Sequence, residues 1–338
     1  NNAVITYSFG LTGAPKGIVI SHRNLIDSAR VVSQYLSLQE NDVLSGIVLF
    51  IVDYGLIQIF CALYEKATLA LHRFILPEDF FNHLIDDEVS ILPLMPVNIS
   101  QMFDDADQRL PSPELFEKLR IITSSGGNVT DRMSNDCARA FPRAQFYSMH
   151  GLTEAFRSTY LDPSQVNIRP DSIGKPIPDV ELYVINEQGK ECAPREVGEL
   201  IHRGGYIYRG FWNGPEENAQ RFKSIEILKD VIDLEGQLTD EIVVASGDYV
   251  YKDEEGYFYF VSRHDDMIKT RGFRVSPYEI ESVVRKNLPQ IDQSAVFSIE
   301  NELIEEEIVL VYSSAHEIPE EEILFELKQH LASYMIPS

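Results

Sequence analysis

The chain has 338 residues, a formal net charge of −24, 44% hydrophobic residues and 24% charged residues. This length exceeds that of a usual single domain, and the composition is typical of a folded globular protein. The negative charge argues against nonspecific binding to nucleic acid or to an anionic membrane surface as the main function. Any anionic ligand must therefore bind at a locally positive site.

The cysteines and histidines favour a reducing compartment and no protein-held metal. Cys61, Cys137 and Cys192 lie far apart without paired spacing, which predicts free thiols in the cytoplasm. The eight histidines show no spacing typical of metal ligands. The chain has no signal peptide and opens directly on a strand-like run, so we expect an N-terminal portion of the protein to precede it.

Residues 46–64 form the most apolar segment of the chain. Asp53 and Gln58 interrupt this segment, and it has no flanking basic residues. We interpret it as a buried core segment and not as a membrane span.

The first 160 or so residues alternate short apolar runs with amphipathic segments, which is typical of a sheet covered by helices. A helix capped by Ser21 is predicted to bury one face. The residues of that face are Leu25, Ala29, Val32 and Leu36. Apolar runs within residues 67–72, 90–95 and 119–127 are predicted to be buried strands.

From about Asp171, short strands separated by Gly, Pro and Asn turns predict a β-rich subdomain. After residue 264, a capping-box pattern of Ser276 and Glu279 starts a helix, and two strands and a second helix from Pro319 follow. We therefore predict an α/β protein with a large α/β domain, whose β-rich subdomain is followed by a small, mobile α+β C-terminal domain. The expected parts are residues 1–170, 171–264 and 265–338.

The stretch YSFGLTGAPKG, residues 7–17, has the composition of a phosphate-binding loop. Its glycines free backbone N–H groups, Thr12 offers a hydroxyl and Lys16 a cation, as a polyphosphate requires. The usual nucleotide loop runs into a helix, whereas Pro15 disfavours helix here and a strand-like run follows. The sequence thus predicts a strand–loop–strand hairpin. Alone, the pattern also fits an ordinary glycine-rich turn.

Further motifs follow in a fixed order. They are HGLTEA (150–155), GELIHRGGYIYRGFWNGPEENAQRF (198–222), ASGDYVYKDEEGYFYFVSRHDDMIKTRGFRVSPYEIE (245–281) and YMIP (334–337). Together with the loop they resemble the AMP-forming adenylating superfamily, which includes acyl-CoA synthetases, adenylation domains of peptide synthetases and luciferases. The resemblance covers essentially the whole chain and looks closest to bacterial acyl-CoA ligases.

The resemblance implies that a carboxylic acid reacts with ATP and Mg²⁺ to give an acyl-adenylate, whose acyl group then passes to the thiol of coenzyme A. It implies phosphate contacts from Ser8, Thr12, Gly13 and Lys16, an α-phosphate contact from Thr153, and a Mg²⁺ ligand in Glu154. It implies adenine and ribose contacts from Gly126, Gly127, Asn128, His150, Gly151, Asp248 and Arg263. It also implies an acyl pocket at Asp53 and Tyr54, a hinge at Asp265 and a thiol tunnel at Gly272.

Elementary electrostatics supports these roles, because attack on a polyphosphate needs cations around the developing charge. Residues 263–274 hold four basic and two acidic side chains, a local net charge of +2. Alone, this run also fits a solvated basic turn. Asp248 could be a strand-end turn residue, Glu154 a carboxylate at a helix start and Asp53 a helix cap.

Four features depart from the superfamily pattern. Phe9 and Leu11 stand where Ser or Thr is usual, and each lost hydrogen bond to a charged phosphate is worth about 1.5–3 kcal/mol. His150 replaces a stacking tyrosine, and Ser262 replaces a glycine before Arg263. The superfamily's catalytic lysine lies beyond the YMIP motif and is absent from this chain, which costs on the order of 10²–10³ in rate. We therefore expect the chain by itself to be an impaired enzyme.

Three functions are consistent with these sequence features. The first is an acyl-CoA ligase. The second is an enzyme that loads an amino acid on a carrier protein, since Asp53 could bind a substrate ammonium. The third, from another class, is a degenerate nucleotide-binding module without turnover, as Phe9, Leu11 and His150 suggest.

Overall fold

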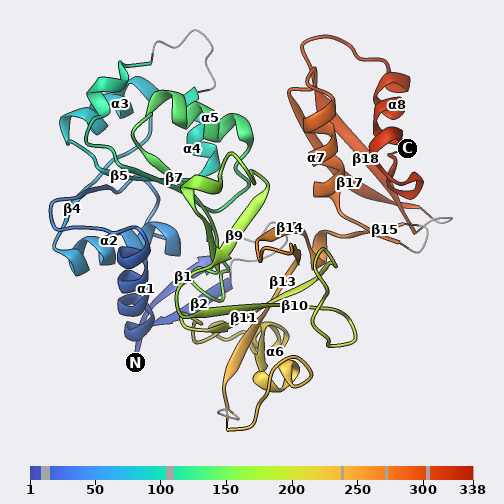
Figure 1. Cartoon of the computed structure of the whole chain (residues 1–338), viewed down its shortest axis with the longest axis horizontal. Coiled ribbons are helices and arrows are strands. Elements are labelled where there is room, and N and C mark those ends of the chain that lie inside the picture. Colours follow the sequence, from blue (N-terminus) through green and yellow to red (C-terminus); the bar gives the residue numbers. More distant parts are fainter. Residues whose placement is uncertain (9–15, 104–109, 237–239, 271–272, 302–304, 338) are drawn as a thin grey trace.

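A computed structural model describes residues 1–8, 16–103, 110–236, 240–270, 273–301 and 305–337 (Figure 1). The helices are α1 (His22–Tyr35), α2 (Asp53–Glu65), α3 (Pro77–Asp86), α4 (Pro96–Phe103), α5 (Asp131–Ala140), α6 (Pro215–Arg221), α7 (Pro277–Asn287) and α8 (Glu320–His330). The first strands are β1 (Asn2–Ser8), β2 (Lys16–Ser21), β3 (Val43–Ser45), β4 (Thr68–Ala70), β5 (Ile91–Leu94), β6 (Ile121–Ser124), β7 (Gln145–His150), β8 (Thr159–Leu161) and β9 (Ser172–Pro176). The later strands are β10 (Val180–Ile185), β11 (Gly198–Gly204), β12 (Phe222–Ser224), β13 (Ile242–Lys252), β14 (Phe258–Arg263), β15 (Ile268–Thr270), β16 (Phe273–Val275), β17 (Gln293–Asn301) and β18 (Glu305–Ser313).

The chain opens with the predicted hairpin. β1 and β2 pair antiparallel, with Ser8 opposite Lys16, and residues 9–15 between them lie outside the described part. Ser21 then caps α1, because its side chain accepts the backbone N–H of Asn24 at 3.1 Å while Asn24 accepts the N–H of Ser21. The predicted capped helix is confirmed, and its apolar face is buried.

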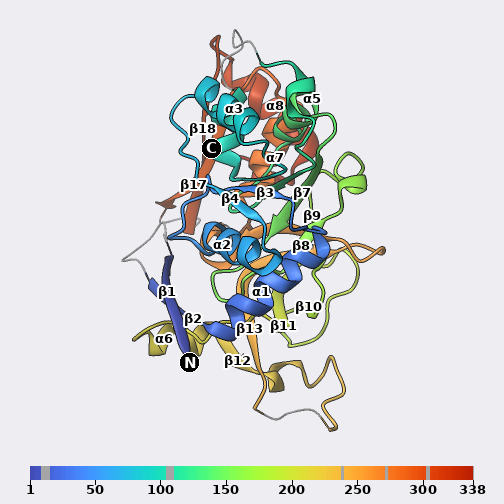
Figure 2. The same ribbon diagram turned by 90° about the vertical axis from the view of Figure 1, so that its left-hand side faces the viewer.

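One large sheet runs through the first 263 residues in the order β10-β11-β13-β14-β9-β8-β7-β6-β5-β3-β4. Strands β3 to β7 pair parallel, and the pairing becomes antiparallel from β8 onward. In the parallel part, α3, α4 and α5 lie on one side of the sheet and α1 and α2 on the other (Figures 1 and 2). The alternation of apolar runs with amphipathic segments thus correctly predicts an α/β fold.

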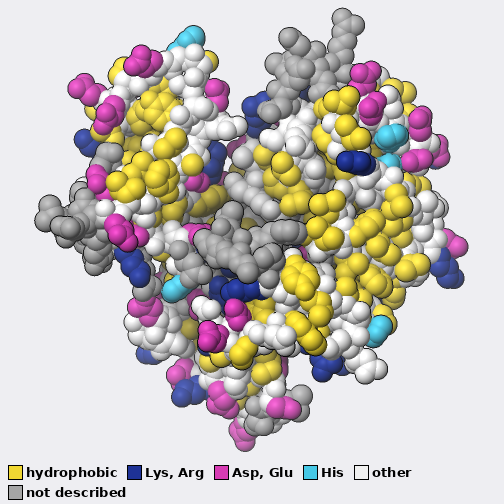
Figure 3. All heavy atoms as spheres, turned by 180° about the vertical axis from the view of Figure 1, so that it is seen from behind, with side chains coloured by type: hydrophobic (Ala, Val, Ile, Leu, Met, Phe, Trp, Pro, Cys, Tyr) yellow, Lys and Arg dark blue, Asp and Glu magenta, His cyan; other side chains and the backbone are white. Residues whose placement is uncertain are grey.

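The apolar segment 46–64 is buried only in part, which corrects the sequence-based expectation. α2 buries Tyr54, Ile57 and Cys61 on one face, whereas Leu49 and Leu63 are 67% and 69% exposed. The helical period turns part of a uniformly apolar run away from the sheet. Figure 3 shows hydrophobic side chains gathered broadly on the half of the molecule that carries these elements. Within the described ranges, no helix has the length and apolarity to cross a membrane.

Residues beyond β14 form a four-stranded antiparallel sheet in the order β16-β15-β18-β17, with α7 and α8 packed against it. Ile280 and Val284 of α7 and Leu327 of α8 are fully buried in an apolar cluster that contains residues of this segment alone. The Ser276 side chain accepts the N–H of Glu279 at 3.2 Å, as the sequence predicts. Pro277 occupies the first helical position, where its missing N–H costs nothing.

Asp42 holds together the amino ends of three parallel strands. Its carboxylate accepts hydrogen bonds from the Ser90 hydroxyl at 2.8 Å, the Arg120 Nε at 2.9 Å and the Gln39 N–H at 2.7 Å. Burial by itself raises the pKa of Asp42, but the bonds from Arg120, Ser90 and Gln39 outweigh it and bring that pKa below its usual value. The ionised form is therefore the one that stabilises the fold.

Replacing Asp42 by Asn should lower the free energy of unfolding at pH 7 by about 1–3 kcal/mol, because charge-assisted bonds are lost. A depressed acid pKa contributes stability that is present above the unfolded value of about 3.9 and is lost as the pH falls through the folded pKa. Urea titrations at pH 7 and pH 3 should therefore show the difference shrinking at the lower pH. The control is Asp27→Asn, since Asp27 pairs with the 90% exposed Arg23, and its effect should stay near zero. Equal effects of the two substitutions would contradict this role of Asp42.

Candidate active site

The candidate site lies where the carboxyl ends of the parallel strands meet. Leu94 of β5, Ser124 of β6 and Ser148 of β7 are register partners, so the segments that follow these strands start at one level. β8 then pairs antiparallel with β7. In open α/β sheets, ligands bind at the carboxyl edge near such a change of strand order.

A cavity of about 220 Å³ occupies this edge. Residues that line it and were predicted as site residues are Asp53, Tyr54, Gly126, Gly151 and Thr153; Thr6, Tyr7, Val52, Met95, Ser125, Leu152, Phe156 and Arg157 complete the lining. The structure thus brings residues of the expected acyl pocket, adenine site and α-phosphate contact to one hollow beside the β1–β2 hairpin.

Asp53 begins α2 on the wall of this cavity. Its Oδ1 accepts the backbone N–H of Tyr54 at 2.7 Å, while the Tyr54 hydroxyl bonds to Oγ1 of Thr123 at 2.7 Å. Burial raises the pKa of Asp53, and the positive charge of Arg157 opposes this shift. Asp53 is therefore the first residue of α2, after the cap residue Val52, and it also lines the cavity.

Asp248 lies in the middle of β13 and is 3% exposed. His150 Nε2 contacts its Oδ2 at 3.1 Å, and Arg263 Nε lies 3.7 Å from its Oδ1. Among the described residues, no hydrogen bond reaches Oδ1. A buried acceptor without a donor is costly, so this oxygen suits a ligand hydroxyl.

Glu154 is likewise buried, at 6% exposure, and its Oε1 lies 3.7 Å from the Nε of Arg221. Gly247 makes room for this arginine, because a Cβ there would lie 1.7 Å from its Nη1. Burial raises the pKa of Glu154, and the charge of Arg221 opposes this shift.

Helix α6 contacts both Lys16 and the carboxylate of Glu154. Lys16 Nζ pairs with Glu217 Oε1 at 3.1 Å, and Glu217 precedes Arg221 by four residues on the same helix. Side chains four apart share one helix face. Lys16 of the hairpin and Glu154 therefore both contact α6, Lys16 through Glu217 and Glu154 through Arg221.

The residues expected to hold adenine lie after β6. Gly126 has a φ of +84°, a conformation that side chains rarely adopt, and a Cβ on Gly127 would lie 3.2 Å from Pro96. Asn128 Oδ1 accepts the hydroxyl of Tyr278 at 3.2 Å, which links this loop to α7. The ring of Phe260 lies between those of His150 and Tyr278, at 6.1 and 5.8 Å.

Several predicted residues lie outside the described part of the chain. Thr12, Gly13 and Gly272 are among them, as are the side chains of Ser8 and Asp265. The backbone of Ser8 belongs to β1, and that of Asp265 to a short 3₁₀ turn, His264–Asp266.

Sequence reasoning missed Arg157 and Arg221. Arg221 stands inside the quoted motif that ends NAQRF, and Arg157 follows the motif HGLTEA by two residues, but a single arginine in or beside a motif does not disclose its partner. Arg221 reaches a carboxylate 67 positions away along the chain, and Arg157 enters the cavity beside α2. Only the folded chain brings these groups together.

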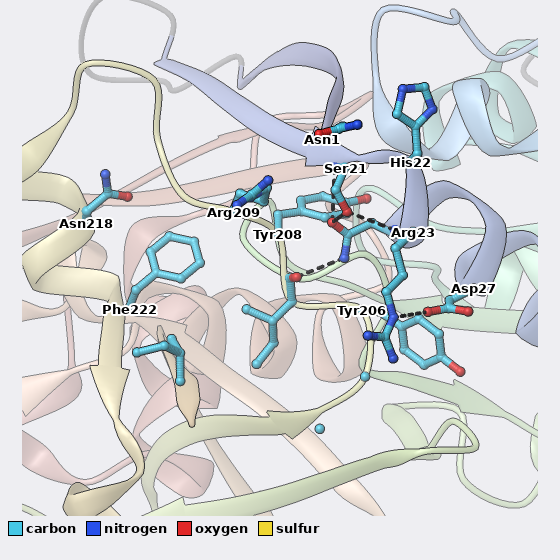
Figure 4. Close-up of a pocket in the computed structure, with 15 residues that line it drawn as sticks. Asn1, Ser21, His22, Arg23, Asp27, Tyr206, Tyr208, Arg209, Asn218 and Phe222 are labelled. Carbon is cyan, nitrogen blue, oxygen red and sulfur yellow. Dashed lines mark hydrogen bonds and ion pairs between the residues drawn. The ribbon is translucent and has the colours of Figure 1, made fainter. Parts of the chain in front are cut away.

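A larger hollow, of about 1160 Å³, lies elsewhere, at the junction of β2 and α1 (Figure 4). The polar groups joined in Figure 4 bond to one another: Asn24 Nδ2 donates to the carbonyl of Ile207 at 2.9 Å, and Arg23 Nε to Asp27 at 3.2 Å. The smaller cavity has the stronger case as a ligand site, because five predicted residues line it together with Arg157, whose buried Nε has no acceptor among the described residues.

Comparison with known proteins identifies the family. The family described as AMP-binding enzyme matches residues 1–212. The chain belongs to this family. It is 27% identical over 353 aligned positions to surfactin synthase subunit 2 of Bacillus subtilis, covering all of this chain and 9% of that protein. It is 28% identical to the acetyl-coenzyme A synthetase of the same species, covering 99% of this chain and 57% of that enzyme.

Solved structures share the fold of this AMP-binding chain. ATP-bound MatB from Rhodopseudomonas palustris superimposes with a TM-score of 0.83 at 24% identity, covering 99% of this chain and 62% of that one. The o-succinylbenzoate CoA synthetase of Bacillus subtilis gives 0.80 at 23% identity, covering 99% and 64%. The chain thus spans less than two thirds of the relatives to which it is similar.

The burial of Glu154 predicts a pH-dependent stability difference. A carboxyl whose folded pKa is raised above 4.5 binds more protons in the folded state, so it destabilises the fold increasingly as the pH rises above that value. Relative to wild type, Glu154→Gln should therefore gain stability between pH 4.5 and pH 8, measured as the shift in thermal midpoint. The exposed Glu40→Gln serves as control and should show no such trend. A variant that loses stability relative to wild type as the pH rises would contradict the inferred burial cost.

Proposed function

We propose that the full-length protein is an ATP-dependent, AMP-forming ligase. It activates a carboxylic acid as an acyl-adenylate and transfers the acyl group to the thiol of coenzyme A in the cytoplasm. Two observations carry the proposal. A small cavity lies at the carboxyl edge of the sheet with Gly151 and Thr153 in its lining, and two carboxylates with distinct surroundings, Asp248 and Glu154, are buried. Membership of the AMP-binding enzyme family supports it.

Asp248 would bind the ribose of ATP. Its Oδ1 is buried and accepts no hydrogen bond in the described part, so a ribose hydroxyl would satisfy it. His150 contacts the other oxygen at 3.1 Å and would hold the carboxylate in place. The same imidazole would stack on adenine, which Gly126, Gly127 and Asn128 would flank together with Gly151.

Glu154 would hold Mg²⁺, which neutralises phosphate charge when bound. The described residues contain no cluster of three metal-ligating side chains, but Mg²⁺ is usually bound by one or two carboxylates plus substrate phosphates. A single buried carboxylate beside Thr153 fits that pattern. Lys16, with Ser8, Thr12 and Gly13 of the hairpin, would surround the β- and γ-phosphates, and Arg263 would lie beside the ribose.

The reaction would proceed in two steps. A carboxylate oxygen of the acid attacks the α-phosphorus, and the bond to the bridging oxygen breaks with departure of pyrophosphate. The thiol sulfur then attacks the acyl carbon, its proton is released, and AMP leaves with the electrons of the broken C–O bond. Gly272 would line the path of the thiol, and Thr153 would orient the α-phosphate.

One observation favours a second candidate, the activation of an amino acid. Asp53 presents a carboxylate to the cavity, and a carboxylate pairs with an ammonium group. The acceptor thiol would then belong to CoA or to the phosphopantetheine of a carrier protein.

Acid-dependent exchange of pyrophosphate into ATP tests the proposal on the full-length protein. Asp248→Ala should raise the KM for ATP by about 10- to 100-fold, because charged hydrogen bonds to the ribose are lost. Asp131→Asn, an exposed change on α5, should leave the KM unchanged. Calorimetric binding of ATP without exchange for any acid would support a nucleotide-binding module without turnover and defeat the ligase.

The hinge proposal concerns Asp265, between the large sheet and the C-terminal sheet. The division of the chain at residues 170 and 264, and the mobility of the C-terminal part, stay predictions. Asp265→Pro should reduce thioester formation at least about 10-fold while pyrophosphate exchange is retained, since proline fixes φ and rotation of one part against the other needs that dihedral free. Asp266→Ala is the neighbouring control. Equal loss of both half-reactions would contradict a hinge at Asp265.

A further inference from the structure

Arg157 is a buried cation without an acidic partner. It is 2% exposed, and no ion pair joins it to a carboxylate in the described part of the chain. Its Nη1 donates to the Ser125 hydroxyl, and its guanidinium lies 5.0 Å from the ring centroids of Tyr54 and Phe156. Its Nε is buried and has no acceptor among the described residues. Arginine is rarely buried unless it is paired, so this donor suits an acceptor group on a ligand.

The neighbouring phenols do not supply a counter-charge. Burial raises the pKa of Tyr54 to about 12, and it raises the pKa values of Tyr35 and Tyr208 as well. All three hydroxyls therefore stay protonated and neutral near pH 7. Asp53 is the only acid among the residues that line the cavity with Arg157.

Asp53 and Arg157 face the same cavity as separate charges. Asp53 acts on Arg157 through space, and no direct ion pair between them occurs in the described structure. The cavity thus offers one negative and one positive group to a ligand. A ligand with an anionic group alone would leave Asp53 facing it, and one with an ammonium alone would leave the guanidinium unsatisfied.

The size of the cavity limits the ligand to a few heavy atoms beyond the reacting carboxylate. Its volume is about 220 Å³, and a cavity of about 150 Å³ holds a molecule of benzene. A cavity of this volume suits a small acid better than a long acyl chain.

We infer that Arg157 is a specificity residue, and that the acid activated here is a small amino acid whose side chain ends in a second carboxylate. The ammonium group pairs with Asp53, the side-chain carboxylate accepts from Nε of Arg157, and the remaining carboxylate lies toward Thr153 for reaction with ATP. This inference rests on the proposed acid activation and narrows its substrate class.

The test compares four acids in pyrophosphate exchange by the full-length protein. Aspartate carries both recognised groups, alanine only the ammonium, succinate only the second carboxylate, and propanoate neither. Aspartate should show a kcat/KM at least about 10-fold above the other three, as each charge-assisted contact contributes about a factor of ten or more. Equal or better exchange with alanine, succinate or propanoate would overturn the inference while leaving the ligase proposal intact.

Substitutions of Arg157 distinguish a role in recognising the substrate from a role in stabilising the fold. Arg157→Gln should raise the KM for aspartate by about 10- to 100-fold with the KM for ATP unchanged, and should shift the preference toward alanine. Arg157→Lys should restore part of the aspartate preference, and Arg143→Gln, which alters a 64% exposed arginine paired with Glu117, should have no effect. An equal loss of kcat with all four acids would show that Arg157 only supports the fold.

A direct binding measurement tests the inference independently of the proposed reaction. If no acid supports exchange, the ligase proposal fails, and calorimetric titration with aspartate then decides the inference. Binding that Arg157→Gln weakens at least about 10-fold would uphold the pocket, whereas no binding of aspartate would overturn it.

Discussion

The change of strand direction between β7 and β8 is the constraint on which the site depends. Up to β7 the strands are parallel, so the loops that follow β5, β6 and β7 all leave the sheet at one edge. β8 then runs back along β7, with Met149 opposite Tyr160 and His150 opposite Thr159. The short turn between these strands carries Thr153, Glu154 and Arg157 back across the edge. Without this reversal the loops would have no opposite wall, and no cavity would form among them.

The distribution of charge gives the site its chemical character. The chain has a net charge of −24, yet three arginines lie at or near this site, and each is placed differently. Arg157 is buried, Arg221 is half-buried, and the side chain of Arg263 is 49% exposed. Arg221 lies against Glu154 and Arg263 against Asp248, whereas Arg157 lines the cavity and forms no ion pair with an acid in the described part of the chain. The first two therefore lie against carboxylates of the protein itself. Under the inference drawn from the structure, the third selects the acid that binds in the cavity.

Several features of the site work against the stability of the fold. Glu154 and Asp53 are carboxylates whose pKa values burial raises, so their ionised forms are disfavoured in the folded chain. Asp248 Oδ1 and Arg157 Nε are buried without hydrogen-bond partners. Proteins commonly violate the rules of good packing at functional sites and gain stability elsewhere. Here the gain comes from groups such as Asp42, whose hydrogen bonds are complete and which lie at the opposite ends of the same strands.

Local chemistry determined much of what the sequence alone predicts. The hairpin before α1, the Ser21 cap, the apolar face of α1 and the start of α7 at Ser276 depend on residues within a few positions of one another, so patterns and propensities were sufficient for them. The resemblance to the superfamily also pointed to Asp53, Tyr54, Gly126, Gly151 and Thr153, which the fold brings to the cavity lining. Tertiary structure alone decided which part of segment 46–64 is exposed, which helix face joins Lys16 to Glu154, and that Arg157 enters the cavity unpaired. These outcomes depend on contacts between residues far apart in the chain, and a linear pattern carries no information about where such partners meet.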